Sequence, residues 1–395
     1  MNNKVVLAYS GGLDTSFCVQ YLKNEKKIEV HTALVNTGGF TKEELDITEK
    51  KAYELGATSH VNIEETSAFY EMGIRYLIFG NILKGNTYPL SVSSERIFQA
   101  IALIEYAKKI GAKYIAHGST GAGNDQVRFD LVFQVLAPDI EIITPIRDLK
   151  ISRQEEIDYL KKCGYDFPWE KAKYSINQGL WGTSVGGVET LSSNGELPEE
   201  AYPTPCTKKG FEKITLSFEK GEPVGINGKR MNPVDVIREL NNMAAPYAIG
   251  RDVHVGDTII GIKGRVGFEA AAPLIIIKAH HLLEKHVLTK WQQYWKDQIS
   301  NWYGMMLHEA QYLDPVMRNM EAFMDSTQSY VTGTVNVKLQ PYHFAITGCQ
   351  SEYDLMNSKF GDYGEINKAF TSDDVKGFTT ILSNQLKIYY ATHDK

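Results

Sequence analysis

Cysteine is scarce in this chain of 395 residues. The four cysteines, Cys18, Cys163, Cys206 and Cys349, are far apart in the sequence and form no C-x-x-C pair. A disulfide framework usually needs several closely spaced cysteines, and a structural zinc site usually needs paired ones. The sequence supports neither, so we expect reduced thiols and no structural metal bound by the protein.

Long apolar runs and a basic surplus are missing as well. The longest apolar run, AAPLIII, is far shorter than the ~18 residues that a membrane-spanning helix needs. The first residues, MNNKVVLAYS, enter a strand pattern without the segments of a signal peptide. The formal net charge is -6, whereas proteins that grip nucleic acid usually carry a basic excess. We therefore expect a cytoplasmic protein with no membrane and no nucleic-acid partner.

The first 165 residues do contain a regular alternation of short β-rich runs and longer helical patterns. The runs are KVVLAY, VHTALVN, SHVNI, KYIAHG and IEIITPI. Repeated β-α-β units favour a parallel sheet with helices on both faces. The sequence therefore predicts an α/β fold with a doubly wound parallel sheet. Ligands of such sheets bind at the carboxyl ends of the strands.

Helix boundaries in this half carry local signals. Thr41 and Glu44 have the spacing of a capping box, which predicts a helix over 41–55. Another helix is expected to begin after Ser93 or Ser94, because isoleucines follow there at helical spacing.

The second half has mixed signals and predicts an α+β arrangement. Residues 166–210 are rich in Gly, Pro and Ser, which indicates a long connection. Asn227-Gly228 is a strong hairpin-turn signal. The pattern then predicts a strand over 257–266, two long helices between 274 and 312, and one amphipathic helix over 378–395.

The stretch AYSGGLDTS joins the first strand to a helix through two glycines. Gly11 and Gly12 allow close backbone approach, and the amide groups at a helix start favour an anion. Asp14 would repel a bare phosphate, whereas a magnesium nucleotide fits an acid among hydroxyl groups. The alternative is a simple glycine turn in which Asp14 or Thr15 caps the helix.

A second glycine-rich loop, GSTGAGNDQVRFD, follows the strand run KYIAH. At the carboxyl edge of the sheet it would lie beside the first loop. Thr120, Asn124, Asp125 and Arg128 offer a hydroxyl, an amide, a carboxylate and a guanidinium, a set that suits an amino acid substrate. The alternative is a solvated loop in which Asn124 and Asp125 cap a helix.

SGGLDTS after the first strand resembles the PP-loop ATP pyrophosphatases, and together with the second loop it resembles the argininosuccinate synthases over nearly the whole chain. The resemblance implies ATP and Mg²⁺, adenylation of the ureido oxygen of citrulline, attack by aspartate, release of AMP and pyrophosphate, and a homotetramer. It also implies an ATP-binding domain over 1–168, a synthetase and multimerisation domain over 169–370, and an oligomerisation helix over 371–395.

The resemblance carries site residues onto this sequence. Asp14, Arg128 and Asp125 are the expected catalytic residues: Asp14 serves magnesium pyrophosphate, Arg128 polarises the ureido end, and Asp125 holds the ammonium of aspartate. The positions that match nucleotide-binding stretches are Ala8, Tyr9, Ser10, Gly11, Gly12, Leu13, Asp14, Thr15, Ser16, Val35, Ala116, His117 and Gly118. The positions that match substrate contacts are Tyr88, Ser93, Thr120, Asn124, Asp125, Arg128, Ser175 and Ser184.

The chain departs from the family pattern near the second citrulline segment. Gly256 and Phe268 stand where an acid and a tyrosine are expected to contact citrulline. Either Asp257 or Glu269 replaces the lost contact, or the substrate is an N-acylated citrulline without an ammonium group. A PP-loop enzyme that modifies tRNA and a nucleotide sensor without activity are further alternatives. The net charge and the lone cysteines count against the tRNA-modifying enzyme, and the second loop and a full second domain count against the sensor.

Overall fold

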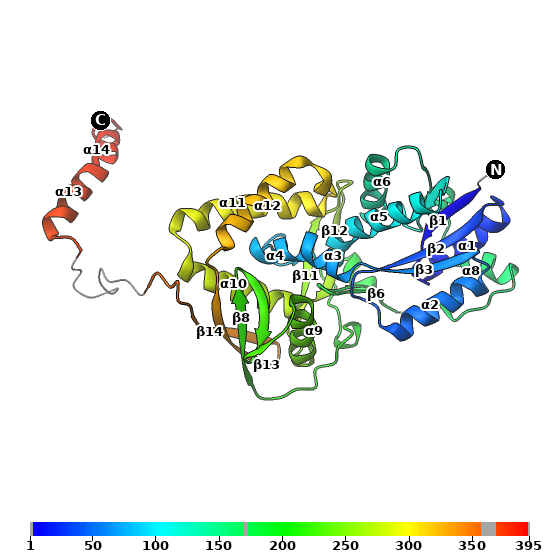
Figure 1. Ribbon diagram of the computed structural model, residues 1–395, viewed down its shortest axis with the longest axis horizontal. Coiled ribbons are helices and arrows are strands. Elements are labelled where there is room, and N and C mark those ends of the chain that lie inside the picture. The colour runs from blue at the N-terminus through cyan, green and yellow to red at the C-terminus, as the bar shows by residue number, and fades with distance from the viewer. Residues whose placement is uncertain (1–2, 170–172, 357–368, 394–395) are drawn as a thin grey trace.

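The computed structural model describes residues 3–169, 173–356 and 369–393 (Figure 1). The predicted α/β fold is confirmed, because its first part is a five-stranded parallel sheet in the order β3-β2-β1-β4-β5. The strands are β1 (Lys4–Ala8), β2 (Glu29–Asn36), β3 (Ser59–Glu64), β4 (Tyr114–Ala116) and β5 (Glu141–Ile143).

Helices cover both faces of this sheet, and the alternation of side chains along β1 explains why the run KVVLAY is apolar throughout. Val5 and Leu7 pack into the core beneath α1 (Leu13–Asn24), α2 (Lys42–Glu54) and α8 (Arg153–Lys162). Val6 points to the opposite core, beneath α5 (Ser91–Lys109) and α6 (Asp125–Leu136). A strand that is buried on both faces needs no polar positions.

The helix starts were predicted with mixed success. The capping box at Thr41 and Glu44 is present and begins α2 at Lys42. The predicted start after Ser93 or Ser94 is wrong, because α5 begins at Ser91. Ser93 and Ser94 donate their hydroxyl groups to carbonyl oxygens three residues back instead of capping amide groups.

The segment 166–210 contains structure that was not predicted. β6 (Ser175–Gly179) and β7 (Gly182–Gly186) form a hairpin. β7 pairs with β12 (Lys263–Glu269), which pairs with β11 (Arg251–Asp257) in an antiparallel sheet ordered β11-β12-β7-β6. The strand predicted over 257–266 is therefore wrong, because the turn of the β11-β12 hairpin falls inside that stretch. Its turn residue Gly261 has φ +83°.

A third sheet is antiparallel, in the order β10-β9-β8-β13-β14. The turn predicted at Asn227-Gly228 is confirmed, with φ of 50° and 78°. The strands are β8 (Glu212–Glu219), β9 (Glu222–Ile226), β10 (Lys229–Arg230), β13 (Gly333–Gln340) and β14 (His343–Gln350). The remaining α-helices described outside the tail are α3 (Thr66–Phe69), α4 (Arg75–Phe79), α7 (Pro145–Leu149), α9 (Pro233–Ala244), α10 (Ala271–Val287), α11 (Lys290–His308) and α12 (Pro315–Gln328).

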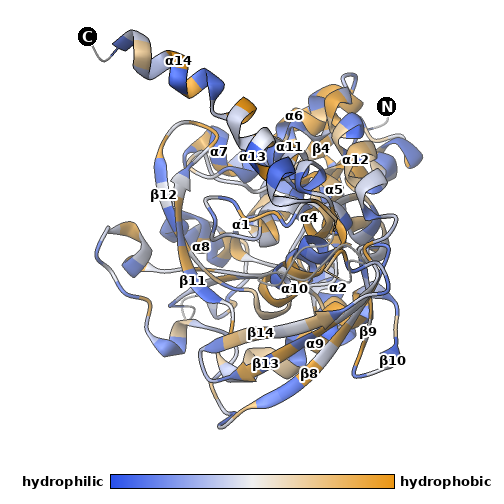
Figure 2. Cartoon of the chain, turned by 90° about the vertical axis from the view of Figure 1, so that its left-hand side faces the viewer, coloured by the Kyte–Doolittle hydropathy of each residue, from blue (hydrophilic) through white to orange (hydrophobic). Residues whose placement is uncertain are grey.

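The tail forms two helices, α13 (Ser372–Leu382) and α14 (Asn384–His393), so the single helix predicted there is wrong. Ser383 separates them, and its hydroxyl donates to the carbonyl of Thr380. Both helices lie apart from the body of the molecule (Figure 1). Figure 2 shows hydrophobic residues alternating with hydrophilic ones along α14. The apolar side chains of both helices are exposed. All four cysteines are free, as expected. No helix of the described residues is long and apolar enough to cross a membrane.

Candidate active site

The two glycine-rich loops meet where the strand order of the parallel sheet reverses, between β1 and β4. A Cβ atom on Gly118 would lie 3.3 Å from the backbone carbonyl carbon of Asp14 and 3.4 Å from the side chain of Thr15. The expectation that the loops lie side by side is therefore confirmed. Such reversal points are the usual ligand sites of open α/β sheets.

The first loop leaves the start of α1 open. Gly11 has φ +74°, a conformation that favours glycine. Gly12 is the N-cap residue, and no side chain caps the helix. The alternative in which Asp14 or Thr15 caps it is therefore wrong, since Thr15 instead donates to the carbonyl of Gly12 at 3.3 Å. An uncapped N-terminus with a positive dipole end suits a phosphate group.

Asp14 lies next to a second carboxyl group, Glu156 of α8, which is 3% exposed. Burial raises the pKa of Asp14, while a hydrogen bond with Glu156 and the charge of Arg153 oppose the increase. Burial and the nearby Asp14 raise the pKa of Glu156 to about 8. Burial and the closeness of the two carboxyl groups therefore favour a proton on this pair near neutral pH.

The donor set around Asp14 fits a magnesium nucleotide. Mg²⁺ commonly binds through one or two carboxylates together with substrate phosphates and water. Ser10 and Thr15 place hydroxyl groups 3.4 Å apart next to Asp14. No cluster of three or more His, Cys, Asp or Glu side chains suited to a metal occurs in the described part of the chain. A cation here would therefore depend on the phosphates for most of its ligands.

The loops open into one cavity of about 1210 Å³, bounded on the other side by β6, β7, β11 and β12. Gly11, Ser16 and Ala116 do not line it, although each was predicted to contact nucleotide. Ser16 and Ala116 are fully buried. The predicted residues that do line it are Ala8, Tyr9, Ser10, Gly12, Leu13, Asp14, Thr15, Val35, Tyr88, Ser93, His117, Gly118, Thr120, Asn124, Asp125, Arg128, Ser175 and Ser184.

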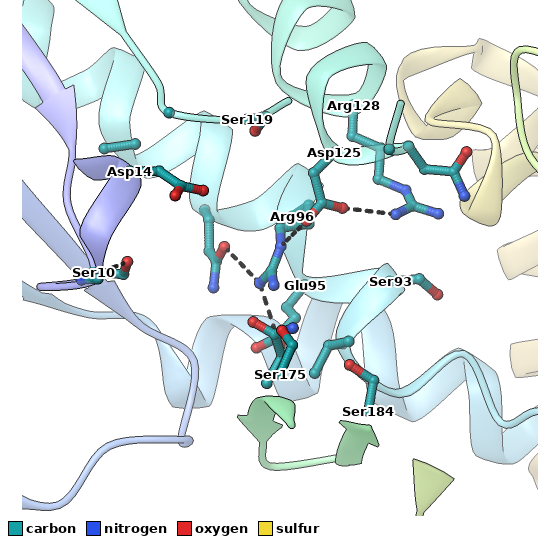
Figure 3. Close-up of a pocket in the computed structure, with 18 of the residues that line it drawn as sticks. Ser10, Asp14, Ser93, Glu95, Arg96, Ser119, Asp125, Arg128, Ser175 and Ser184 are labelled. Carbon is teal, nitrogen blue, oxygen red and sulfur yellow. Dashed lines mark hydrogen bonds and ion pairs between the residues drawn. The ribbon is translucent and has the colours of Figure 1, made fainter. Parts of the chain in front are cut away.

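Asp125 lies between two guanidinium groups in the middle of this cavity (Figure 3). Its Oδ2 accepts from Arg96 Nε at 2.9 Å, and its Oδ1 accepts from Arg128 Nη1 at 2.9 Å. Burial alone would raise the pKa of Asp125, but the two arginines lower it to about 2. Arg128 also donates to the carbonyl oxygen of His308 at 3.1 and 3.0 Å. The loop and α11 are thereby joined through Arg128.

Asn124 connects the second loop to the β11-β12 turn. Its Oδ1 accepts from the amide of Ile259 at 2.9 Å. The side chain of Asn124 makes no capping bond to α6, so the alternative of a helix cap is wrong for this residue. The loop that follows β4 is therefore held by contacts with the later part of the chain.

Glu95 and Arg96 line the cavity and were not predicted. Glu95 is 2% exposed, accepts from the hydroxyl of Thr37 and lies 3.5 Å from Arg96. Burial raises the pKa of Glu95 to about 7, against the opposing charge of Arg96. The sequence did offer a signal, since SSERIF places adjacent charges at the start of a mostly buried helix.

The cavity wall farther from the first loop contains Tyr88, stacked against His254 with ring centroids 5.2 Å apart. Phe268 also packs against Tyr88, with ring centroids 5.4 Å apart. Ser184 faces the same end from β7, and Ser93 faces it from α5 (Figure 3). His254 was not predicted, because a single histidine in a strand carries no distinguishing sequence signal.

Sequence comparisons relate the chain to known proteins. A sequence model of the arginosuccinate synthase N-terminal HUP domain matches residues 4–166, and one of the C-terminal domain matches residues 174–389. The argininosuccinate synthase of Dictyoglomus thermophilum is 38% identical over 388 residues, which cover 98% of this chain and 97% of the relative. That of Methanocaldococcus jannaschii is 36% identical over 392 residues, 98% of each chain. That of Xanthomonas campestris pv. campestris is 35% identical over 397 residues, again 98% of each.

Proposed function

Because the chain belongs to the argininosuccinate synthase family of ATP-dependent ligases, we propose that its large cavity activates a ureido group with ATP and joins it to aspartate. The observation that carries this proposal is the meeting of the two loops. An open helix start suited to phosphates adjoins a charged cluster suited to an amino acid, within one cavity.

The ureido oxygen is a poor leaving group, so it must be activated before an amine can displace it. That oxygen attacks the α-phosphorus of ATP, and the bond to the β-phosphate breaks to release pyrophosphate. The amine of aspartate then attacks the activated carbon, loses a proton and displaces AMP. With citrulline the product is argininosuccinate, so the reaction belongs to arginine biosynthesis. No side chain forms a covalent intermediate, and the protein contributes orientation and charge stabilisation.

On the nucleotide side, the amide groups at the start of α1 would hold the phosphates, and Asp14 would hold Mg²⁺. The ion neutralises the charge of the departing pyrophosphate when it is bound. The charge of Arg153 supports this role, because it opposes the effect of burial on the pKa of Asp14 and favours its charged form.

In the part of the cavity next to the second loop, Thr120, Asn124 and Asp125 would bind aspartate, with Asp125 next to its ammonium group. Arg128 would polarise the ureido end. Asp125 stays ionised at any physiological pH because two arginines contact it. Both roles are therefore compatible with the charges in the cavity.

The comparisons favour argininosuccinate synthesis over a PP-loop enzyme that modifies tRNA, since none of the three relatives bears such a name. The names do not mention an N-acyl substituent either. We further propose the cytoplasm as location, a homotetramer as assembly, and the division at 168 and 370 as domain boundaries.

Pyrophosphate release tests the proposal. The purified protein should release pyrophosphate from ATP only when a ureido substrate and aspartate are both present. Replacing aspartate by asparagine serves as the control. Release without aspartate, or release stimulated by tRNA, would contradict it, and tight ATP binding without any turnover would indicate a nucleotide sensor.

A further inference from the structure

Helix α2 packs against the first glycine-rich loop at Gly11. A Cβ atom on Gly11 would lie 3.3 Å from Cγ2 of Thr48, so the loop passes close to this helix. Nearly one turn further along α2, Nζ of Lys51 donates to the carbonyl oxygen of Gly11 at 2.6 Å. Positions three apart on a helix lie on the same face. Two side chains of α2 therefore hold the same residue of the loop.

The ammonium group of Lys51 lies among groups that attract a cation. Its Nζ is 3.7 Å from the ring centroid of Trp169 and 4.9 Å from that of Phe167, and the face of an aromatic ring is negative. Arg153 of α8 donates to the carbonyl of Trp169 at 2.8 Å. Burial lowers the pKa of Lys51 to about 8, while the charge of Glu54 in the same helix opposes the decrease. Lys51 is therefore mainly charged at pH 7 and mainly neutral at pH 9.

The bond from Lys51 sets the direction of the peptide group between Gly11 and Gly12. A planar trans peptide points its carbonyl and its amide in opposite directions. The Gly11 carbonyl is bound by α2 and Gly11 does not line the cavity, whereas Gly12 does. The amide of Gly12 donates to the hydroxyl of Ser10 at 3.5 Å, a long contact that a phosphate oxygen can replace. This amide is therefore directed to the side on which a phosphate would bind.

We propose that Lys51 is a positioning residue for ATP, which holds the Gly11 carbonyl so that the Gly12 amide faces the phosphates. The inference rests on the proposed function, because that function assigns the first loop to ATP. Lys51 does not line the cavity, so it acts through the loop. A neutral amine donates a weaker bond than an ammonium group, and loss of the charge should loosen the loop. Binding of the triphosphate then weakens, whereas binding of the ureido substrate and aspartate does not.

Calorimetric titration with α,β-methylene-ATP tests the inference without turnover, because this analogue cannot release pyrophosphate. Lys51→Met removes the charge and keeps a long unbranched side chain. With Mg²⁺ at pH 7 we expect its Kd to be about tenfold higher than that of the unaltered protein, the ratio that one charged hydrogen bond provides. Lys50→Met, at the exposed neighbouring position of α2, is the control and should leave Kd unchanged.

Steady-state rates separate positioning from a general loss of structure. In Lys51→Met the KM for ATP should rise with Kd, while the KM values for citrulline and aspartate should change little. A loop that merely unfolded the site would raise all three values together, so an equal rise in the three would overturn the inference.

The pH profile provides a readout that a structural role would not move. In the unaltered protein Kd should rise several-fold between pH 7 and pH 9, because Lys51 loses its proton. Glu156 also titrates there, but it does so in Lys51→Met as well, so the additional rise in the unaltered protein belongs to Lys51. Lys51→Arg keeps a charged donor at pH 9 and should lack this additional rise.

The possible outcomes distinguish the inference from the function on which it rests. Equal Kd values for Lys51→Met and Lys50→Met, or the same pH dependence in Lys51→Met as in the unaltered protein, would overturn the inference. A Kd for Lys51→Arg as high as that for Lys51→Met would also overturn it. Failure of the unaltered protein to bind the analogue would instead contradict the proposed function.

Discussion

At the scale of the residue, the proton shared by Asp14 and Glu156 couples stability to pH. The ordinary pKa of a glutamate is 4.5, and in the folded chain that of Glu156 is about 8. The folded state therefore binds more protons than the unfolded state between these values, so stability should fall as pH rises through this window. In Glu156→Gln the fall should be smaller, since glutamine stays neutral. Urea unfolding at pH 5.5 and pH 8 measures the difference.

Glu239→Gln provides the matched control, because Glu239 is exposed on α9. It should keep the pH dependence of the unaltered protein. The same decline in stability for Glu156→Gln as for the control would show that the two carboxyl groups do not share a proton.

Asp14→Asn separates the proposed chemistry from folding. The change removes the carboxylate for Mg²⁺ and also removes repulsion from Glu156. Pyrophosphate release should almost vanish, while the free energy of unfolding should change by no more than about 1 kcal/mol. Steady-state rates and urea melts measure the two effects. Asp46→Asn, at an exposed position of α2, is the control and should leave the rate of pyrophosphate release unchanged. An unchanged rate in Asp14→Asn would refute the assignment of Asp14.

Asp125→Asn tests which ligand this carboxylate serves. Loss of a charged hydrogen-bond partner typically costs about 1.5 to 3 kcal/mol, so KM for aspartate should rise far more than KM for ATP. An equal rise in both values would instead mean that Asp125 mainly positions Arg96 and Arg128, which contact its two oxygens.

At the scale of the element, the β9-β10 turn isolates the cost of a backbone conformation. Gly228 has φ +78°, and a Cβ atom there would meet nothing within 4 Å. Gly228→Ala should therefore destabilise the protein by about 1 to 2 kcal/mol through the left-handed conformation alone. Gly377, in α13, is equally open but has no positive φ. Gly377→Ala should cause no loss, and equal losses in thermal unfolding experiments would contradict the explanation.

Elements with a strong local cause could be predicted from the sequence. The five strands of the parallel sheet, the capping box at Thr41 and the Asn227-Gly228 turn each carry a signal in neighbouring residues. The β6-β7 hairpin was missed because Gly179 and Gly182 interrupt the alternation of its side chains. Its register is fixed by pairing with β12, about 80 residues later.

The residues of the candidate site also divide into those that a continuous motif predicts and those that only contacts with distant residues place there. The two loops could be recognised because each is a continuous motif. Arg96 and His254 could not be placed in the cavity from sequence, because their roles depend on contacts with Asp125 and Tyr88. The departure at Gly256 was visible in the sequence, but the ion pairs of Asp257 with Lys263 and of Glu269 with Arg251 were not.

At the scale of the whole molecule, the tail exposes an apolar surface without a cover. Phe378 is 63% exposed, Ile381 77%, and Leu386 63%. Exposed apolar clusters of this kind commonly mark association surfaces. Removal of residues 369–395 should therefore yield a smaller assembly, with the mass determined by light scattering. The control Lys376→Ala, on the same helix, should leave the assembly intact, and an unchanged mass after truncation would contradict the proposed role.

The cavity is assembled from segments that lie far apart in the chain. The loops at the sheet reversal come from residues before 130, and the wall with His254, Gly256 and Gly264 comes from β11 and β12. Mutations can therefore alter the residues of one cavity wall without altering those of the other. A related enzyme could acquire a different ureido substrate through substitutions at alternate positions of one hairpin, while the loops that bind ATP stay the same. A chimera that carries the β11-β12 hairpin of a relative should acquire the substrate preference of that relative.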